Sequence, residues 1–261
     1  DGDGFDDVLA GAPGAGVDGA GESAGIAHLA YGPVEGIVVA YVEDSFQGEE
    51  YGGELGWSVA GAGDVNGDGY DDVLLGTHGS APAFLFYGPA SGAVSAADAD
   101  AVFGEGSSYG WSVAAAGDVD GDGFDDVMLG LPGHGAAYLF LGPVSGAYDD
   151  LDADADATFS GVPGSFTGES VSAATDIDGD GTIDYVVGAP ATDNESGVHG
   201  GAAYMVYGPV SGDRSLATAD AVLWGMEASE GVGYEVSTPG DLDGDGYDEV
   251  LVGAWRHDGG A

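Results

Sequence analysis

Residues 64–72 decide the fold: they read Asp64-Val65-Asn66-Gly67-Asp68-Gly69-Tyr70-Asp71-Asp72. The same pattern returns at 118–126 (DVDGDGFDD), 176–184 (DIDGDGTID) and 241–249 (DLDGDGYDE). The chain also begins within a further copy at residues 1–7 (DGDGFDD), which lacks the first two positions. We number the positions from 1 to 9 and call the copies loops 1 to 5 in chain order.

Each loop carries the oxygen-rich side chains that a hard cation prefers. Carboxylates at positions 1, 3, 5 and 9 can converge on one ion, and the glycine at position 6 permits a turn that brings the position-7 carbonyl toward it. Without an ion these carboxylates repel one another, so the loop needs a metal to close. We therefore predict one Ca²⁺ per loop. The predicted ligands are Asp1, Asp3, Phe5 and Asp7; Asp64, Asn66, Asp68, Tyr70 and Asp72; Asp118, Asp120, Asp122, Phe124 and Asp126; Asp176, Asp178, Asp180, Thr182 and Asp184; and Asp241, Asp243, Asp245, Tyr247 and Glu249.

The five loops are not equivalent. Loop 1 has no position-1 ligand, so its site is expected to be weak or empty. Asn66 gives loop 2 one charge fewer, and Glu249 reaches further than an aspartate, so the affinities are expected to differ. Position 8 is acidic in four copies (Asp6, Asp71, Asp125 and Asp248). If position 9 faces the ion, strand alternation turns position 8 away, and we expect a solvated side chain rather than one that helps to bind a second shell.

The loops are not EF-hands. An EF-hand loop requires a bidentate glutamate at position 12 followed by a helix. Position 12 here is Leu75, Leu129, Val187 or Val252, and each lies in a short β-prone run that ends at glycine. The pattern instead indicates a calcium-bound turn that joins two β-strands.

Charge and composition exclude several classes of partner. The 261 residues include no cysteine and only two basic side chains, Arg214 and Arg256, which gives a formal net charge of −45. Such a surface cannot replace the counterions of nucleic acid or of an anionic membrane. No apolar run approaches membrane-spanning length, so direct insertion in a membrane is not expected. We expect an extracellular or cell-surface protein in a saline environment, where salt screens the self-repulsion.

The loops recur at intervals of 54, 58 and 65 residues, the size of a propeller blade. Each unit has a strand before the loop, one after it, a third that is almost wholly apolar, and a fourth, such as 100–103, that carries acids and is expected to form an exposed outer edge. The units are roughly 1–54, 55–108, 109–166, 167–231 and 232–261 within one domain, 1–261. We predict an all-β protein built of four-stranded antiparallel blades, with about four complete blades and part of a fifth, as a fragment of a larger propeller.

Several motifs resemble one known family. Leu55-Gly56-Trp57-Ser58-Val59, its counterpart at 109–113, the acidic loops and the Gly-Ala-Pro turns at 11–13 and 188–190 together look like FG-GAP repeats, the blades of integrin α-chain propellers. The resemblance implies a seven-bladed propeller with calcium in the hairpins on one face and ligand contacts on the other. Thr167-Gly168 and Val232-Gly233 replace the "FG" pair in later copies, and Gly76-Thr77-His78 and Gly130-Leu131-Pro132 depart from "GAP".

Three functional hypotheses follow, the third of which is a purely structural shell component. The first is a non-catalytic, calcium-dependent module for adhesion or for recognition of an unidentified protein or glycan. The alternative is an accessory or substrate-binding propeller of a larger secreted hydrolase or lyase. No nucleophile motif indicates catalysis within this segment. His78, His134, His199 and His257 recur after the second strand, and we interpret them as packing residues rather than as a rim that binds a partner or a transition metal.

Overall fold

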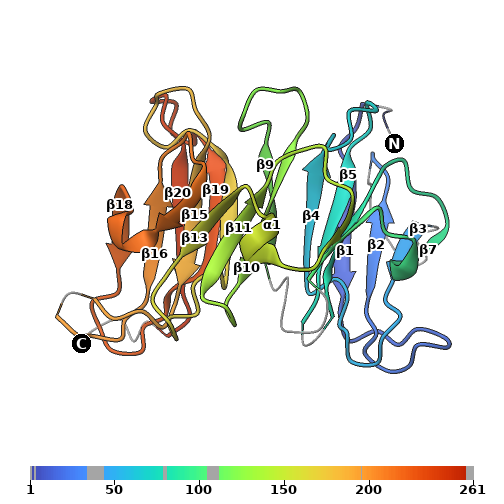
Figure 1. Ribbon diagram of the computed structural model, residues 1–261, viewed down its shortest axis with the longest axis horizontal. Coiled ribbons are helices and arrows are strands. Elements are labelled where there is room, and N and C mark those ends of the chain that lie inside the picture. Colours follow the sequence, from blue (N-terminus) through green and yellow to red (C-terminus); the bar gives the residue numbers. More distant parts are fainter. Residues whose placement is uncertain are drawn as a thin grey trace.

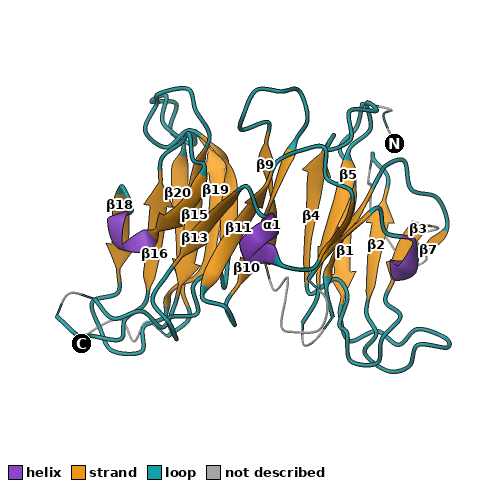
Figure 2. Ribbon diagram, viewed as in Figure 1, coloured by secondary structure: helices purple, strands orange, loops and turns teal. Residues whose placement is uncertain are grey.

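The structure is a computed structural model that describes residues 2, 4–33, 44–78, 81–104, 112–194 and 196–256. Five sheets stand with their strands upright in the view of Figure 1; the first three follow one another from the right-hand side, and the strands of the fifth overlap those of the fourth at the left. Strands and loops make up almost all of the described chain (Figure 2). The all-β prediction is confirmed, and the row of blade-like sheets is a partial β-propeller.

Strand bounds follow the repeats. The first sheet contains β1 (Val8–Ala12), β2 (Ile26–Ala30), β3 (Asp44–Gln47) and β7 (Ala93–Ser95). The second contains β4 (Ser58–Gly63), β5 (Asp72–Gly76), β6 (Ala83–Phe86), β8 (Ala101–Phe103) and β12 (Gly146–Tyr148). The third contains β9 (Ser112–Gly117), β10 (Asp126–Leu131), β11 (Ala136–Phe140), β13 (Ala157–Ser160) and β17 (Gly212–Ser215). The fourth contains β14 (Val171–Thr175), β15 (Asp184–Ala189), β16 (Ala202–Val206) and β18 (Ala221–Trp224), and the fifth contains β19 (Val232–Gly240) and β20 (Glu249–Ala254). The described helices are single turns: η1 (Ala96–Asp98), α1 (Leu151–Asp154) and η2 (Leu216–Thr218).

The central strands of the second, third and fourth sheets are apolar on both faces because each of these sheets packs between two others. Leu74 of β5 belongs to the core shared with the third sheet, whereas the next residue, Leu75, belongs to the core shared with the first. In β15, Tyr185 likewise packs against the third sheet and the next residue, Val186, packs against the fifth. Burial of each large side chain stabilises the fold by about 1.5–3 kcal/mol, so the sheet-to-sheet interfaces hold the molecule together.

Serines link the first strands of neighbouring blades. The backbone N–H of Val113 donates to Ser58 Oγ at 3.2 Å, that of Val171 to Ser112 Oγ at 3.0 Å, and that of Val236 to Ser170 Oγ at 3.0 Å. These bonds satisfy backbone donors that pairing within a single sheet leaves free. The recurring Ser-Val pair is therefore part of the contact between blades.

The glycines of the recurring FG-type and GAP-type motifs, called the signature glycines below, also lie against one another between blades. Gly188, at the end of β15, lies so close to Gly233 of the next blade that a Cβ built on Gly188 would be 2.0 Å from the Gly233 carbonyl oxygen. Gly11 approaches Gly56, and Gly130 approaches Gly168, at equivalent distances of 1.9 and 2.1 Å. Only glycine allows two backbones to come this close.

The expectation of an exposed fourth strand is wrong for the first three sheets. Ala101 and Phe103 of β8 are fully buried, and β12 pairs with β8 in parallel on its outer side. β7 covers β3, and β17 covers β13, in the same manner. Each covering strand comes from the connection between the third and fourth strands of the next repeat. Adjacent blades are therefore joined by strand pairing at their outer edges, and these sheets contain both parallel and antiparallel pairs.

The acids beside the fourth strands also have a local function. Asp100 Oδ2 accepts the backbone N–H of Tyr87 at 2.8 Å, and Asp156 and Asp220 accept equivalent bonds from Leu141 and Tyr207. They cap the end of the third strand, where the ladder leaves a donor unpaired.

No helix in the described part of the chain is long and apolar enough to cross a membrane.

Candidate metal centres

Loops 2 to 5 are the hairpins between the first and second strands of successive sheets, and they line the upper edge of the row in Figure 1. Of the residues predicted for loop 1, Asp1 and Asp3 lie outside the described residues. Phe5 is exposed, and Asp7 is half-buried, with Oδ1 accepting the N–H of Gly32 at 2.9 Å.

The position-1 aspartate organises each hairpin. Asp64 Oδ1 accepts the N–H groups of Gly67 and Asp68 at 2.7 and 2.9 Å, and Asp64 Oδ2 accepts that of Gly69 at 2.8 Å. Asp118, Asp176 and Asp241 accept the same three bonds at 2.6–3.2 Å. Backbone donors therefore fold the loop around one carboxylate and leave further lone pairs for a ligand.

Positions 3 and 5 extend this pattern. In loops 2 to 5 the side-chain oxygen of position 3 accepts the N–H of position 5, and that of position 5 accepts the N–H of position 7, at 2.8–3.1 Å. These bonds draw successive side chains to the same side of the turn. In loop 2 the neutral Asn66 also donates from Nδ2 to Asp68 Oδ2 at 3.1 Å, which offsets part of the repulsion there.

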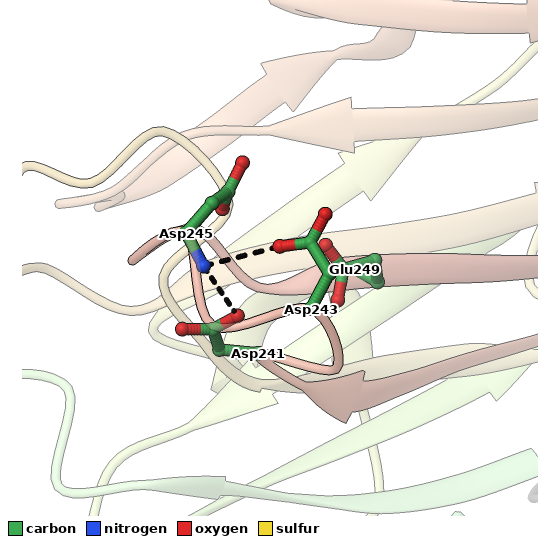
Figure 3. A group of neighbouring side chains, drawn as sticks. All are labelled: Asp241, Asp243, Asp245 and Glu249. Carbon is green, nitrogen blue, oxygen red and sulfur yellow. Dashed lines mark hydrogen bonds between the residues drawn. The ribbon is translucent and has the colours of Figure 1, made fainter.

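In each of three loops, the carboxylates lie close enough together to bind one ion. Asp241, Asp243, Asp245 and Glu249 each offer a ligand atom, and these atoms lie within 4.8 Å of one another (Figure 3). Asp118, Asp120 and Asp122 form such a group in loop 3, and Asp176, Asp178 and Asp184 form one in loop 4. These side chains offer only hard oxygen donors, so a divalent cation such as Ca²⁺ fits the donor set. Asp72, Asp126 and Asp180 do not belong to these groups.

In loops 2 to 4 the position-9 acid is buried and joins two parts of its blade. Asp72 is 1% exposed; its Oδ2 accepts the N–H of Val65 at 3.0 Å, and its Oδ1 accepts that of Gly88 at 2.8 Å. Asp126 and Asp184 bond in the same way to Gly142 and Gly208. This bond explains why the Gly-Pro segment recurs after the third strand: the glycine N–H donates to the acid that ends the metal loop.

Burial perturbs these acids. Desolvation raises the pKa of Asp72 and of Asp126 to about 6, although two backbone N–H groups oppose the shift in each case. The charges at positions 1 and 5 of loop 2, and at positions 1 and 3 of loop 3, raise these pKa values further. Burial also raises the pKa of Asp184. A cation at the loop would lower these pKa values, because it favours the charged form.

We expect the protein in chelator to unfold at a lower temperature at pH 7 than at pH 5. Asp72 and Asp126 have folded pKa values of about 6, against an ordinary value of 3.8. Between these pH values the folded state binds more protons than the unfolded state, so the free energy of unfolding decreases as pH rises. Thermal melts at constant ionic strength measure the difference. Asp72→Asn should reduce it, and an equal difference in the variant would contradict this assignment.

The expectation that position 8 is solvated is wrong for Asp125 and Asp248, whereas Asp6 and Asp71 are exposed. Asp125 Oδ2 accepts the backbone N–H of Asp64 at 2.8 Å, and Asp248 Oδ2 accepts that of Asp176 at 2.9 Å. Both aspartates therefore contact the position-1 residue of the preceding loop. Alternation does turn position 8 away from its own ion site, but another blade lies in that direction.

The histidines make separate local contacts near the opposite edge. His78 Nδ1 lies 2.9 Å from Glu54 Oε2, and its ring stacks on Trp57 with centroids 4.4 Å apart. His134 lies 3.5 Å from the Tyr138 hydroxyl, and His199 pairs with Asp193. Among the described residues no group of three metal-binding side chains contains a histidine. The His199 side chain is 73% exposed, so the interpretation of the histidines as packing residues stays a prediction. His257 lies outside the described residues.

Comparison with known proteins agrees with this arrangement. Residues 64–129 match the family described as FG-GAP-like repeat. Integrin alpha-PS5 of Drosophila melanogaster is 31% identical over 162 residues, covering 57% of this chain and 16% of that protein. Integrin alpha pat-2 of Caenorhabditis elegans is 30% identical over 233 residues, covering 77% of this chain and 18% of that protein.

A protein with an enzyme name is also similar. Phosphatidylinositol-glycan-specific phospholipase D of Bos taurus is 28% identical over 156 residues, covering 56% of this chain and 18% of that protein. The chain thus spans less than a fifth of the length of each of these relatives. The matched repeat, the integrin alpha relatives and the row of blade-like sheets together place this chain among the FG-GAP repeat proteins, as an integrin-alpha-like β-propeller segment.

Proposed function

We propose that this chain is a calcium-binding, non-catalytic module of an extracellular or cell-surface protein, used in adhesion or in recognition of a protein or glycan. The observation that carries the proposal is the recurrence of one loop geometry in loops 2 to 5, with three to four acids within 4.8 Å in three of them. The integrin alpha relatives support a recognition role.

Calcium has a structural role in this proposal. Each ion neutralises two charges and holds positions 1, 3, 5, 7 and 9 in one arrangement, which fixes the hairpin between two strands. Because loops 2 to 5 occupy one edge of successive sheets, rigid hairpins also fix the sheets that carry the loops at the opposite edge. Those opposite loops are the proposed contact surface for the ligand.

Calcium titration tests the metal assignment. We expect four ions per chain, from loops 2 to 5, with affinities on the order of 10⁻⁴–10⁻³ M as in other extracellular modules. Asp122→Ala should remove one ion, measured by isothermal titration calorimetry and by equilibrium dialysis with elemental analysis. The matched control is Asp98→Ala, an exposed acid in η1 outside the loops, which should retain four. Unchanged stoichiometry in Asp122→Ala would refute the ligand assignment.

The similarity to a phospholipase D favours a second candidate, an accessory propeller of a larger hydrolase. The two roles differ in what the chain binds. A protein and glycan array, probed with calcium and with chelator, should reveal a calcium-dependent matrix-protein or glycan ligand for the recognition module. Selective binding of an enzyme substrate, such as a glycosylated phosphatidylinositol, would favour the accessory role instead.

A further inference from the structure

Asp125 of loop 3 forms hydrogen bonds with the backbone of Asp64, the position-1 residue of loop 2. Its Oδ2 accepts the backbone N–H of Asp64 at 2.8 Å, and its own N–H donates to the Asp64 carbonyl oxygen at 3.1 Å. The approach requires glycine at the preceding residue, since a Cβ on Gly63 would lie 2.1 Å from Asp125 Oδ2. The residue around which loop 2 folds is therefore bound on both backbone groups by the next blade.

Loop 5 holds loop 4 by the same contacts. Asp248 Oδ2 accepts the N–H of Asp176 at 2.9 Å and the hydroxyl of Thr175 at 2.8 Å. The Asp248 N–H donates to the Asp176 carbonyl oxygen at 3.0 Å. The recurrence in a second pair of blades shows that the contact belongs to the repeat.

Position 7 adds an aromatic contact to each pair. A Cβ on Gly67, at position 4 of loop 2, would lie 2.6 Å from the Phe124 ring, so the ring packs directly on that backbone. Tyr247 packs in the same way on Gly179 of loop 4, at 2.7 Å. Gly67 and Gly179 donate their N–H groups to Asp64 and Asp176, so both contacts reach the same ligand network.

Loops 3 and 4 lack this connection. Loop 4 carries Thr182 and Ile183 at positions 7 and 8, and a Cβ on Gly121 of loop 3 would meet no atom within 4 Å. Within the described residues no hydrogen bond joins Ile183 to Asp118. Among loops 2 to 5, the contacts that join successive loops are therefore interrupted between loops 3 and 4.

We propose that Asp125 and Asp248 are positioning residues for the calcium site of the preceding loop, so that loops 2 and 3, and loops 4 and 5, bind calcium as two coupled pairs. The inference rests on the proposed function. Position 8 lies between two ligands of its own loop, at positions 7 and 9. An ion that fixes those ligands also fixes the aspartate between them, and thereby the first ligand of the neighbouring loop. Thermodynamic coupling is reciprocal, so an ion in loop 2 favours binding in loop 3 equally.

The test is calcium titration of Asp125→Ala, which retains all proposed ligands. We expect four ions at saturation, with one site weakened about tenfold, within the usual range of coupling between sites. Asp71→Ala is the matched control: it removes the same side chain at position 8 of loop 2, but Asp71 is exposed. All affinities in Asp71→Ala should equal those of the wild type.

A double mutant identifies which of the calcium sites is weakened. Asp68→Ala removes the loop 2 ion, so adding Asp125→Ala should then weaken no remaining site. A weakened site that persists in this background would locate the effect in loop 3 and overturn the inference, as would equal affinities in Asp125→Ala and Asp71→Ala. Failure of the wild type to bind calcium would refute the proposed function instead.

Asp248→Ala tests the second pair independently, should Asp125→Ala fail to fold. It should weaken one site, and Asp178→Ala, which removes the loop 4 ion, should abolish that weakening. Asp180→Ala in loop 4 should leave loop 3 unchanged, because the two loops are not connected. A loop 3 affinity that fell in this variant would contradict the proposed break between the pairs.

Discussion

Chelation of calcium is expected to lower the midpoint temperature of thermal unfolding by more than about 20 °C. At a free calcium concentration 100 times Kd, each site contributes about 2.7 kcal/mol to the free energy of unfolding, so four sites contribute roughly 11 kcal/mol. In a protein of this size, 1 kcal/mol corresponds to about 2–4 °C in the midpoint temperature. Four ions also bring the formal charge from −45 to about −37, which reduces self-repulsion.

Calorimetry or circular dichroism at constant high salt measures this effect. Sodium chloride at the same ionic strength is the control, because it screens surface charges but does not supply a divalent ion to the loops. Asp122→Ala, which affects one loop, should lose only part of the shift. A melting curve that is identical in calcium and in chelator would remove the proposed structural role of the metal.

Gly188→Ala is expected to destabilise the protein by about 2–3 kcal/mol and to lower the midpoint temperature by roughly 5–10 °C. The added methyl group would lie 2.0 Å from the carbonyl oxygen of Gly233, so the fourth and fifth sheets must separate. The nearest atom belongs to the backbone, which cannot relieve the clash by a change of rotamer. The contacts of Val186 and Ala203 with Val236 would loosen at the same time.

The matched control is Gly61→Ala in β4, where a Cβ meets no atom within 4 Å and the backbone is not left-handed. This variant should melt near the wild-type temperature, measured in saturating calcium so that the loops are in the same state. Equal stability of Gly188→Ala and Gly61→Ala would mean that the two signature glycines do not set the distance between blades.

The loops and the strands around them could be predicted because their determinants are local. The spacing of acids and glycines in residues 64–72 defines the turn, and the hydrogen bonds to Asp64 span only three to five residues. Apolar position 12, as in Leu75, excluded the EF-hand helix, and β5 indeed runs through it. The individual calcium ligands stay a prediction.

Position 8 shows where local reasoning fails. Strand alternation states correctly that Asp125 points away from its own loop, but the position of Asp64 in the preceding blade depends on how the two blades pack. The same holds for β12, which covers β8 through residues 45 positions away in the chain. No pattern within one repeat encodes the surface that a neighbouring repeat presents.

The sequence by itself determined the hairpin turns and the all-β class, because each depends on a periodic pattern within a short segment. Only the tertiary structure decided which glycines touch, which strands close the outer edges and which loops support one another. Those features depend on the spacing and register between blades. Spacing and register are set when side chains from different repeats pack together in one close-packed interior.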